Sequence, residues 1–119
     1  MLVSKKVTFE AAHFLPGHPK CGVMHGHHFK VALAVEGQVN PATGMVIDFT
    51  NLKKWLQENV IEQFDHTLLN DKIENPTAEN IVEYIREKYG KTGFQVSADV
   101  KLAYIRIWET EDSMAEWRA

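Results

Sequence analysis

The 119-residue sequence contains a single cysteine, Cys21, and has no long run of apolar residues. A single cysteine excludes an internal disulfide, which is typical of proteins in reducing compartments and leaves a free thiol to be explained. Residues 1–6 lack the apolar core of a signal peptide, and no apolar run approaches the length of a transmembrane helix. We therefore expect a cytoplasmic protein that does not contact a membrane.

Clusters of positive charge are also missing. The chain has 13 Lys and Arg residues against 16 Asp and Glu residues, a formal net charge of −3, and the two signs are interspersed. No basic run could follow a phosphate backbone, so nucleic acid is not an expected partner. No glycine-rich dinucleotide motif occurs, and no redox cofactor is expected. The length predicts a single domain, residues 1–119, that buries about two-thirds of its unfolded surface.

Hydrophobic periodicity predicts strands and helices in the order ββααββ. Two helices on one face of a four-stranded antiparallel sheet give an α+β fold, whose open sheet edges need protection or pairing with other subunits. The expected strands are residues 7–13, 25–36, 94–110 (with a break near 101–103) and 114–117. The expected helices are residues 52–64, capped by Asp48 or Thr50, and 77–90, capped by Thr77 and ending at Gly90.

Four of the six histidines lie in two short motifs, residues 9–13 and 21–29. In a strand, His25 and His27 point to one face with Cα atoms about 7 Å apart, and His13, from the neighbouring strand, shares their parity. Three neutral imidazoles without a thiolate leave a fourth position open, as in catalytic zinc sites. We interpret the three as Zn²⁺ ligands; the alternative is hydrogen-bonded core or surface histidines. His28 has the opposite parity and is expected to be exposed.

Three further residue groups are candidates for chemistry. Cys21 lies in a Pro- and Gly-rich loop four residues before His25, and is either a reactive thiol or a small buried hydrophobe. In Asp65-His66, the carboxylate can orient the imidazole for proton transfer, or the pair can simply end a helix. Glu109 shares a strand face with two isoleucines, so it either binds donor groups of a ligand or marks the point where the strand reaches solvent.

These groups belong to a series of motifs that runs in order along nearly the whole chain. The motifs are Phe9-Glu10-Ala11-Ala12-His13, Cys21-x-x-x-His25-Gly26-His27, Asp48-Phe49, Asp65-His66 with Leu69-Asn70, Pro76-Thr77-Ala78-Glu79-Asn80 and Glu109-Thr110. Their combination resembles the 6-pyruvoyltetrahydropterin synthase family. The three residues between Cys21 and His25 resemble its carboxypterin branch, which acts in queuosine biosynthesis.

The resemblance implies a tunnelling fold, in which three subunits join their sheets into a barrel and two such rings stack into a homohexamer. It also implies a zinc-dependent lyase that converts 7,8-dihydroneopterin triphosphate to 6-carboxy-5,6,7,8-tetrahydropterin, acetaldehyde and triphosphate. Two alternatives stay open. One is the 6-pyruvoyl product of the tetrahydrobiopterin pathway, and the other is a zinc-binding module without turnover.

The family's residue roles follow where this sequence matches its motifs. The resemblance implies that His13, His25 and His27 bind zinc. Cys21, Asp65 and His66 match the catalytic triad, in which the cysteine and the Asp-His pair come from different subunits. Glu109 matches the residue that binds the pterin ring, and Thr77 and Ala78 match the lining of the same pocket.

Overall fold

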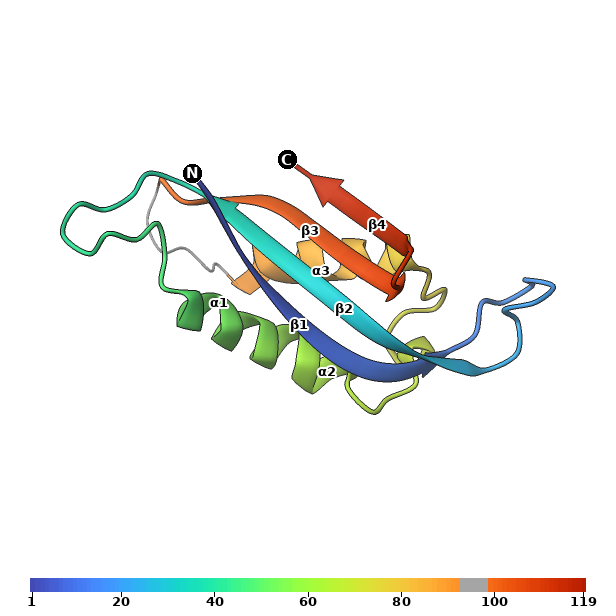
Figure 1. The fold of residues 1–119 in the computed structure, drawn as a ribbon. Helices are drawn as coiled ribbons and strands as arrows, with labels where there is room; N and C mark the ends of the chain where they lie inside the picture. The colour runs from blue at the N-terminus through green and yellow to red at the C-terminus, as the bar shows by residue number, and fades with distance from the viewer. Residues whose placement is uncertain (93–98) are drawn as a thin grey trace.

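In a computed structural model, which describes residues 1–92 and 99–119, four strands form one antiparallel sheet. Each strand pairs with the next in sequence, so the order across the sheet is β1-β2-β3-β4 (Figure 1). The strands are β1 (Leu2–His13), β2 (His25–Glu36), β3 (Lys101–Thr110) and β4 (Ser113–Arg118). The predicted α+β architecture with its four-stranded antiparallel sheet is confirmed.

Strand β1 begins at Leu2 and not at Val7, so its predicted start is wrong. The additional residues pair with the end of β2, where Val3 lies opposite Val35, and Val3 packs against the core. Lys5 interrupts the apolar alternation, because it occupies a core-facing parity between Val3 and Val7 and is only half-buried. One polar residue on the inner face therefore hid the first half of the strand.

The first helical segment is continuous but not uniform. It comprises α1 (Phe49–Leu56), a π-helical turn η1 (Gln57–Ile61) and α2 (Glu62–Phe64). The predicted helix over residues 52–64 exists, but it begins earlier because Asp48 caps it directly. The Oδ1 atom of Asp48 accepts a hydrogen bond from the Thr50 amide at 2.8 Å.

The second long helix, α3 (Ala78–Thr92), follows a short 3₁₀ turn, η2 (Leu69–Asp71). Thr77 caps it as predicted, since its Oγ1 accepts a hydrogen bond from the Asn80 amide at 3.1 Å. The predicted end at Gly90 is wrong, because Gly90 does not adopt the positive φ of a left-handed cap and the helix continues to Thr92. Among the described residues, none of the helices combines the length and the apolar character needed to cross a bilayer.

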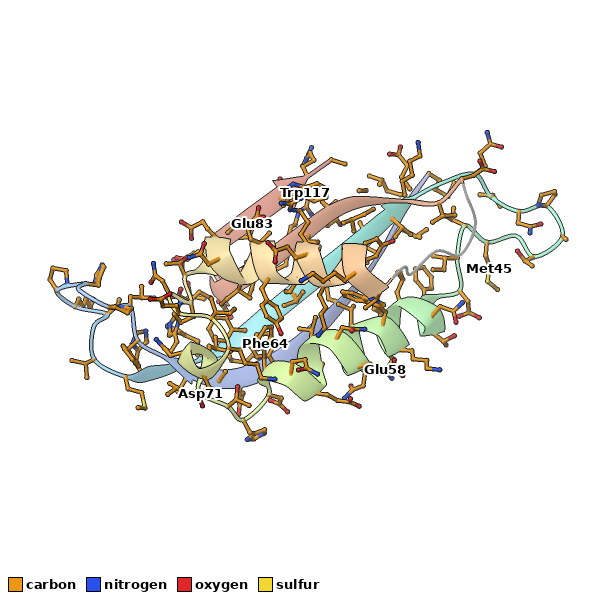
Figure 2. All side chains as sticks on the ribbon, turned by 180° about the vertical axis from the view of Figure 1, so that it is seen from behind. Met45, Glu58, Phe64, Asp71, Glu83 and Trp117 are labelled. Carbon is orange, nitrogen blue, oxygen red and sulfur yellow. The ribbon has the colours of Figure 1, made fainter. Side chains whose placement is uncertain are left out.

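Both helical segments cover the same face of the sheet, and the hydrophobic core lies between the two layers (Figures 1 and 2). Residues of alternate parity in the strands fill this core; Phe9 and Phe29, for example, stack with ring centroids 5.0 Å apart. Fully burying such a side chain contributes about 1.5–3 kcal/mol. The largest fully buried apolar side chains are Phe9, Phe29, Phe64, Leu33, Leu52, Leu56, Leu69, Ile81, Ile85, Ile105 and Ile107.

Strand β3 contains two irregularities. The first lies at Ala103, because Ala34 pairs with Tyr104 whereas Val35 pairs with Leu102, and it matches the break predicted near residues 101–103. The second lies at Glu109, where the pairing with β4 shifts by one residue. Most of the strand predicted for residues 94–100 falls outside the described residues, and β3 begins at Lys101.

The outer edge of β1 is partly covered by the segment that follows α2. The Glu10 carbonyl accepts a hydrogen bond from the His66 amide at 2.6 Å, and the Ala12 amide donates to the Thr67 carbonyl at 3.0 Å. Ala12 also forms an isolated parallel bridge with Leu68. Within the described part of the chain, residues 2–8 on this edge have no ladder partner.

Candidate metal centre and active site

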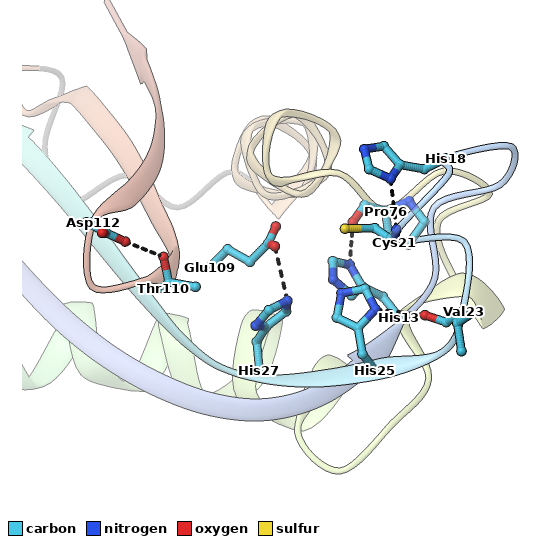
Figure 3. A network of polar contacts seen from close by, with 10 residues as sticks. All are labelled: His13, His18, Cys21, Val23, His25, His27, Pro76, Glu109, Thr110 and Asp112. Carbon is cyan, nitrogen blue, oxygen red and sulfur yellow. Dashed lines mark hydrogen bonds and ion pairs between the residues drawn. The ribbon is translucent and has the colours of Figure 1, made fainter.

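Three imidazoles meet at the end of the β1–β2 hairpin, on the face that carries the helices (Figure 3). His13 lies directly opposite His25 in the strand register, and Ala11 lies opposite His27. The ring centroids of the three histidines are 4.6, 4.8 and 5.2 Å apart. Potential ligand atoms of these histidines and of Glu109 all lie within 4.8 Å of one another. The predicted grouping of the histidines is thus confirmed, and the cluster could hold a metal ion.

Backbone carbonyl groups fix the orientation of two of the rings. His13 Nδ1 lies 2.9 Å from the Pro76 carbonyl oxygen, and His25 Nδ1 lies 2.8 Å from that of Val23. A carbonyl can only accept, so each Nδ1 carries the proton and each neutral ring keeps its lone pair on Nε2. This is the arrangement in which a second partner orients a metal-ligating histidine.

The cluster also contains polar atoms that the described residues leave unsatisfied. His13 is completely buried, yet its Nε2 has no hydrogen-bond partner, and the same is true of the buried Nε2 of His27. An unsatisfied buried polar atom costs about 1–3 kcal/mol. A metal ion bound by these nitrogens would remove that cost, so the donor set fits a divalent ion that accepts imidazole ligands, such as zinc.

The rings of Phe29 and Phe9 pack beneath the cluster, and we call these two residues the aromatic floor. His13 and His27 each pack nearly perpendicular to Phe29, with ring centroids 5.5 and 5.6 Å from that of Phe29. Phe29 in turn stacks on Phe9 in the centre of the core. Because close-packed cores resist distortion, the position of the imidazoles is tied to the folding of the whole domain.

Glu109 completes the group from β3. Its Oε1 lies 3.0 Å from His27 Nε2, a separation at which the two groups form an ion pair if the imidazole is protonated. Burial lowers the pKa of His27 below its ordinary value of 6.5; the neighbouring His13 and His25 lower it as well, and only Glu109 acts in the opposite direction. The neutral ring, which is the form that binds metals, is therefore favoured.

Cys21 lies on the loop that leads into His25 (Figure 3) and is half-buried. Asp65 and His66 lie elsewhere, beside the outer edge of β1, where Asp65 Oδ1 accepts a hydrogen bond from the Glu10 amide at 3.0 Å. Among the described residues, no hydrogen bond or ion pair joins Cys21 to Asp65 or His66. The structure of one chain therefore does not bring the three predicted catalytic residues together.

His66 has an unusual backbone conformation. Its φ of 59° lies in the left-handed region, which costs about 1–2 kcal/mol for a residue with a Cβ atom. Its Nε2 lies 3.6 Å from Asp65 Oδ2, and its side chain is largely exposed. His66 also lines a hollow of about 660 Å³, together with Glu10 and His28. Strained residues of this kind gather at functional sites, which agrees with a role for the exposed imidazole.

Sequence reasoning missed the backbone and amide groups that build the site. Pro76 precedes the predicted cap Thr77, and its carbonyl orients His13. The side chain of Asn70 forms two hydrogen bonds with the backbone of Phe14. Its Oδ1 accepts from the Phe14 amide at 3.0 Å, and its Nδ2 donates to the Phe14 carbonyl at 2.9 Å. The Pro76 carbonyl could not be predicted, because a backbone carbonyl has no sequence signature. Asn70 belongs to one of the sequence motifs, but the sequence did not indicate its role. His28 is exposed as predicted, with Nδ1 3.4 Å from Glu10 Oε1.

Fold and cluster together define the class: an α+β domain that carries a preformed site of three imidazoles and a carboxylate at the end of a β-hairpin. The 6-pyruvoyl tetrahydropterin synthase family matches residues 2–119, and the chain belongs to this family. The family resemblance predicted from the sequence motifs is thereby confirmed.

Relatives in this family carry several names. A protein of Archaeoglobus fulgidus, provisionally named 6-carboxy-5,6,7,8-tetrahydropterin synthase, is 44% identical over 99% of this chain and 96% of its own length. The 6-carboxy-5,6,7,8-tetrahydropterin synthase of Synechocystis is 39% identical over 77% of each chain. A protein of Pyrococcus furiosus named dihydroneopterin monophosphate aldolase is 36% identical over 87% of this chain and 85% of its own.

A solved structure supports the fold. The 6-pyruvoyl tetrahydropterin synthase of Caenorhabditis elegans superposes with a TM-score of 0.86 at 26% sequence identity. The match covers 100% of this chain and 95% of that one. The arrangement of sheet and helices is therefore that of the family.

Proposed function

We propose that this protein is a zinc-dependent lyase that converts 7,8-dihydroneopterin triphosphate to 6-carboxy-5,6,7,8-tetrahydropterin, acetaldehyde and triphosphate, in queuosine biosynthesis in the cytoplasm. The observation that carries the proposal is the imidazole cluster, with Nε2 lone pairs free on His13 and His25. The names of two relatives and the three-residue spacer between Cys21 and His25 support this reaction over formation of the 6-pyruvoyl product.

His13, His25 and His27 would hold the ion. Bound there, zinc supplies Lewis-acid polarisation of the hydroxyl oxygens on the substrate's side chain. The protein's own contribution is to keep the three rings in place, through the Pro76 and Val23 carbonyls and the Phe29 floor. This preorganisation makes the site available before the substrate arrives.

Proton transfer is assigned to Cys21 and His66. The thiolate of Cys21 takes a proton from a side-chain carbon, and His66 exchanges protons with the substrate's oxygens. One carboxylate oxygen of Asp65 accepts a hydrogen bond from the Glu10 amide, and the other lies 3.6 Å from His66 Nε2. Asp65 can therefore orient the imidazole and stabilise its protonated form. Side-chain cleavage then consumes one water molecule and releases acetaldehyde, and the internal reduction of the pterin, at the expense of the side-chain carbons, requires no redox cofactor.

Glu109 is proposed to bind the pterin ring by accepting hydrogen bonds from its amino and N–H groups. A His27 Nε2 that ligates a metal carries no proton, so the carboxylate oxygens of Glu109, one of them 3.0 Å away, would remain available to accept hydrogen bonds from the substrate. Thr77 and Ala78, at the start of α3, would line the same pocket beside Pro76.

The proposed assembly unites the two separated halves of the site. Both sheet edges, β1 and β4, can pair with another subunit, so three sheets can join into a barrel and two rings can stack into a homohexamer. Cys21 of one subunit would then meet Asp65 and His66 of its neighbour. This would explain why no hydrogen bond or ion pair joins them within the described residues of one chain.

Product analysis tests the proposal. Zinc-loaded protein is incubated anaerobically with 7,8-dihydroneopterin triphosphate, and the products are identified by mass spectrometry. The expected result is 6-carboxy-5,6,7,8-tetrahydropterin with an equal amount of acetaldehyde. A 6-pyruvoyl product would contradict the reaction while keeping the metal site and triad, and unchanged substrate would favour a zinc-binding module without turnover.

A further inference from the structure

The loop that carries Cys21 is held together by its own hydrogen bonds. The Leu15 amide donates to the Cys21 carbonyl at 2.7 Å, and the His18 amide donates to the Leu15 carbonyl at 3.0 Å. The Gly22 amide donates to the His18 carbonyl at 3.0 Å. The backbone thus closes into a small ring in which residues 15, 18 and 21–22 contact one another.

The imidazole of His18 lies on the outside of this ring and turns its Nδ1 toward the Cys21 amide (Figure 3). Its Nδ1 accepts hydrogen bonds from the amide of Cys21 at 2.8 Å and from the amide of Lys20 at 3.1 Å. Two N–H donors on one ring nitrogen require a lone pair there, so His18 is a neutral imidazole with its proton on Nε2. The backbone of Cys21 is therefore held by two hydrogen bonds: its N–H donates to His18 Nδ1, and its carbonyl accepts from the Leu15 amide.

The backbone packs so closely around His18 that positions 17 and 22 favour glycine. A Cβ atom at position 22 would lie 2.6 Å from the His18 carbonyl oxygen, closer than nonbonded atoms approach, so the ring requires a glycine there. Gly17, just before His18, has a φ of +78°, which a residue with a side chain rarely adopts. These two glycines let the chain fold tightly enough for the imidazole to reach both amides.

We infer that His18 is a positioning residue for the reaction. Its Nδ1 accepts hydrogen bonds from the amides of Lys20 and Cys21, and these bonds hold the thiol of Cys21 in place for proton transfer. The inference rests on the proposed function of Cys21. Residues 16–20, which include His18, are exposed, and the core residues lie elsewhere. Loss of the imidazole should therefore loosen the loop without unfolding the domain or emptying the metal site.

Two substitutions separate positioning from other roles of the imidazole. His18→Ala removes the acceptor, whereas His18→Asn keeps one, because its Oδ1 is bonded to Cγ just as Nδ1 is. The asparagine cannot exchange a proton near neutral pH, so it can restore positioning but not acid-base chemistry. Asn40→Ala is a matched control, since it removes a similar bond, from the Ala42 amide to Asn40 Oδ1 at 2.9 Å, in a different exposed loop.

For His18→Ala we expect kcat to fall by about 10- to 100-fold, the usual consequence of a slightly misplaced reacting group, with little change in KM. Zinc content and Tm should stay at their wild-type values. His18→Asn should return kcat close to the wild-type value, and Asn40→Ala should leave it unchanged. A His18→Ala enzyme with wild-type kcat, or a His18→Asn enzyme as impaired as His18→Ala, would overturn the inference.

Alkylation of Cys21 by iodoacetamide gives a readout that needs no turnover. Because Cys21 is the only cysteine and is half-buried, its alkylation rate should rise about fivefold or more in His18→Ala, as expected from the loss of two hydrogen bonds, and return in His18→Asn. If the wild-type protein converts no substrate, the proposed function fails while the alkylation rates still test the positioning. Equal rates in all three proteins would refute it.

Discussion

Metal-linked stability offers the sharpest test of the histidine cluster, because the chain supplies its own control. His27 points into the cluster, whereas its neighbour His28 is exposed on the opposite face of the same strand. We compare the thermal unfolding of His27→Ala, His28→Ala and wild-type protein, each prepared without metal and then titrated with zinc at one fixed protein concentration.

The expected size of the effect follows from binding linkage. A ligand present at 100 times its Kd stabilises the folded state by about 2.7 kcal/mol. For a domain of this length, 1 kcal/mol corresponds to roughly 4 °C in Tm, so zinc should raise the Tm of the wild-type protein by about 10 °C. His28→Ala should show the same shift. His27→Ala should lose most of it, because two imidazoles remain where three converged.

Without metal, the same substitution should have little effect. His27 Nε2 lacks a hydrogen-bond partner, so removing the ring also removes an unsatisfied polar atom and offsets part of the lost packing. We expect the metal-free His27→Ala protein to unfold within about 1 kcal/mol of the wild type. A full zinc shift in His27→Ala, or its loss in His28→Ala, would refute the assignment of the ligands.

Three further predictions concern the thiol, the pH dependence and the floor of the site. Cys21→Ala should abolish turnover but still bind one zinc per chain by elemental analysis, and an empty site would contradict the open-position arrangement. Since the folded pKa of His27 is lowered, the unfolded chain binds more protons, so metal-free stability is complete above about pH 6.5 and falls on acidification toward the lowered value. Urea unfolding from pH 7.5 to 5.5 should show a steeper loss for wild type than for His27→Gln, and parallel curves would contradict the shift. Phe29→Ala should cost about 3–5 kcal/mol in urea unfolding and weaken zinc binding in the remaining folded protein; a small cost with unchanged affinity would contradict the role of the aromatic floor.

Strand parity was enough to predict how the histidine cluster is built. Side chains alternate between faces, so His25 and His27 had to share a face, and the matching parity of His13 placed it beside them once the strands paired antiparallel. The structure confirms this grouping, the order of the elements and the cap at Thr77. The roles of the catalytic and substrate-binding residues remain predictions.

Other features depended on contacts that no local pattern records. The Pro76 carbonyl reaches His13 across 63 positions of sequence, and a carbonyl is present at every residue. Asp65 was expected to end a helix or to orient His66, but its contact with the Glu10 amide depends on how the segment after α2 lies against β1. The early start of β1 was hidden by Lys5 on the inner face. These differences arise where tertiary contacts override a local signal.

The bridge between Ala12 and Leu68 has a consequence for how a second chain can extend the sheet. It closes the end of the β1 edge beside the histidine cluster, so an incoming strand could pair only with residues 2–8, a stretch of about 23 Å at the usual rise per residue. Strand β4 has 6 residues and nearly matches that opening. In the proposed assembly, the segment after α2 would therefore limit the register of a neighbouring strand, and it would place His66 at the point where that strand ends.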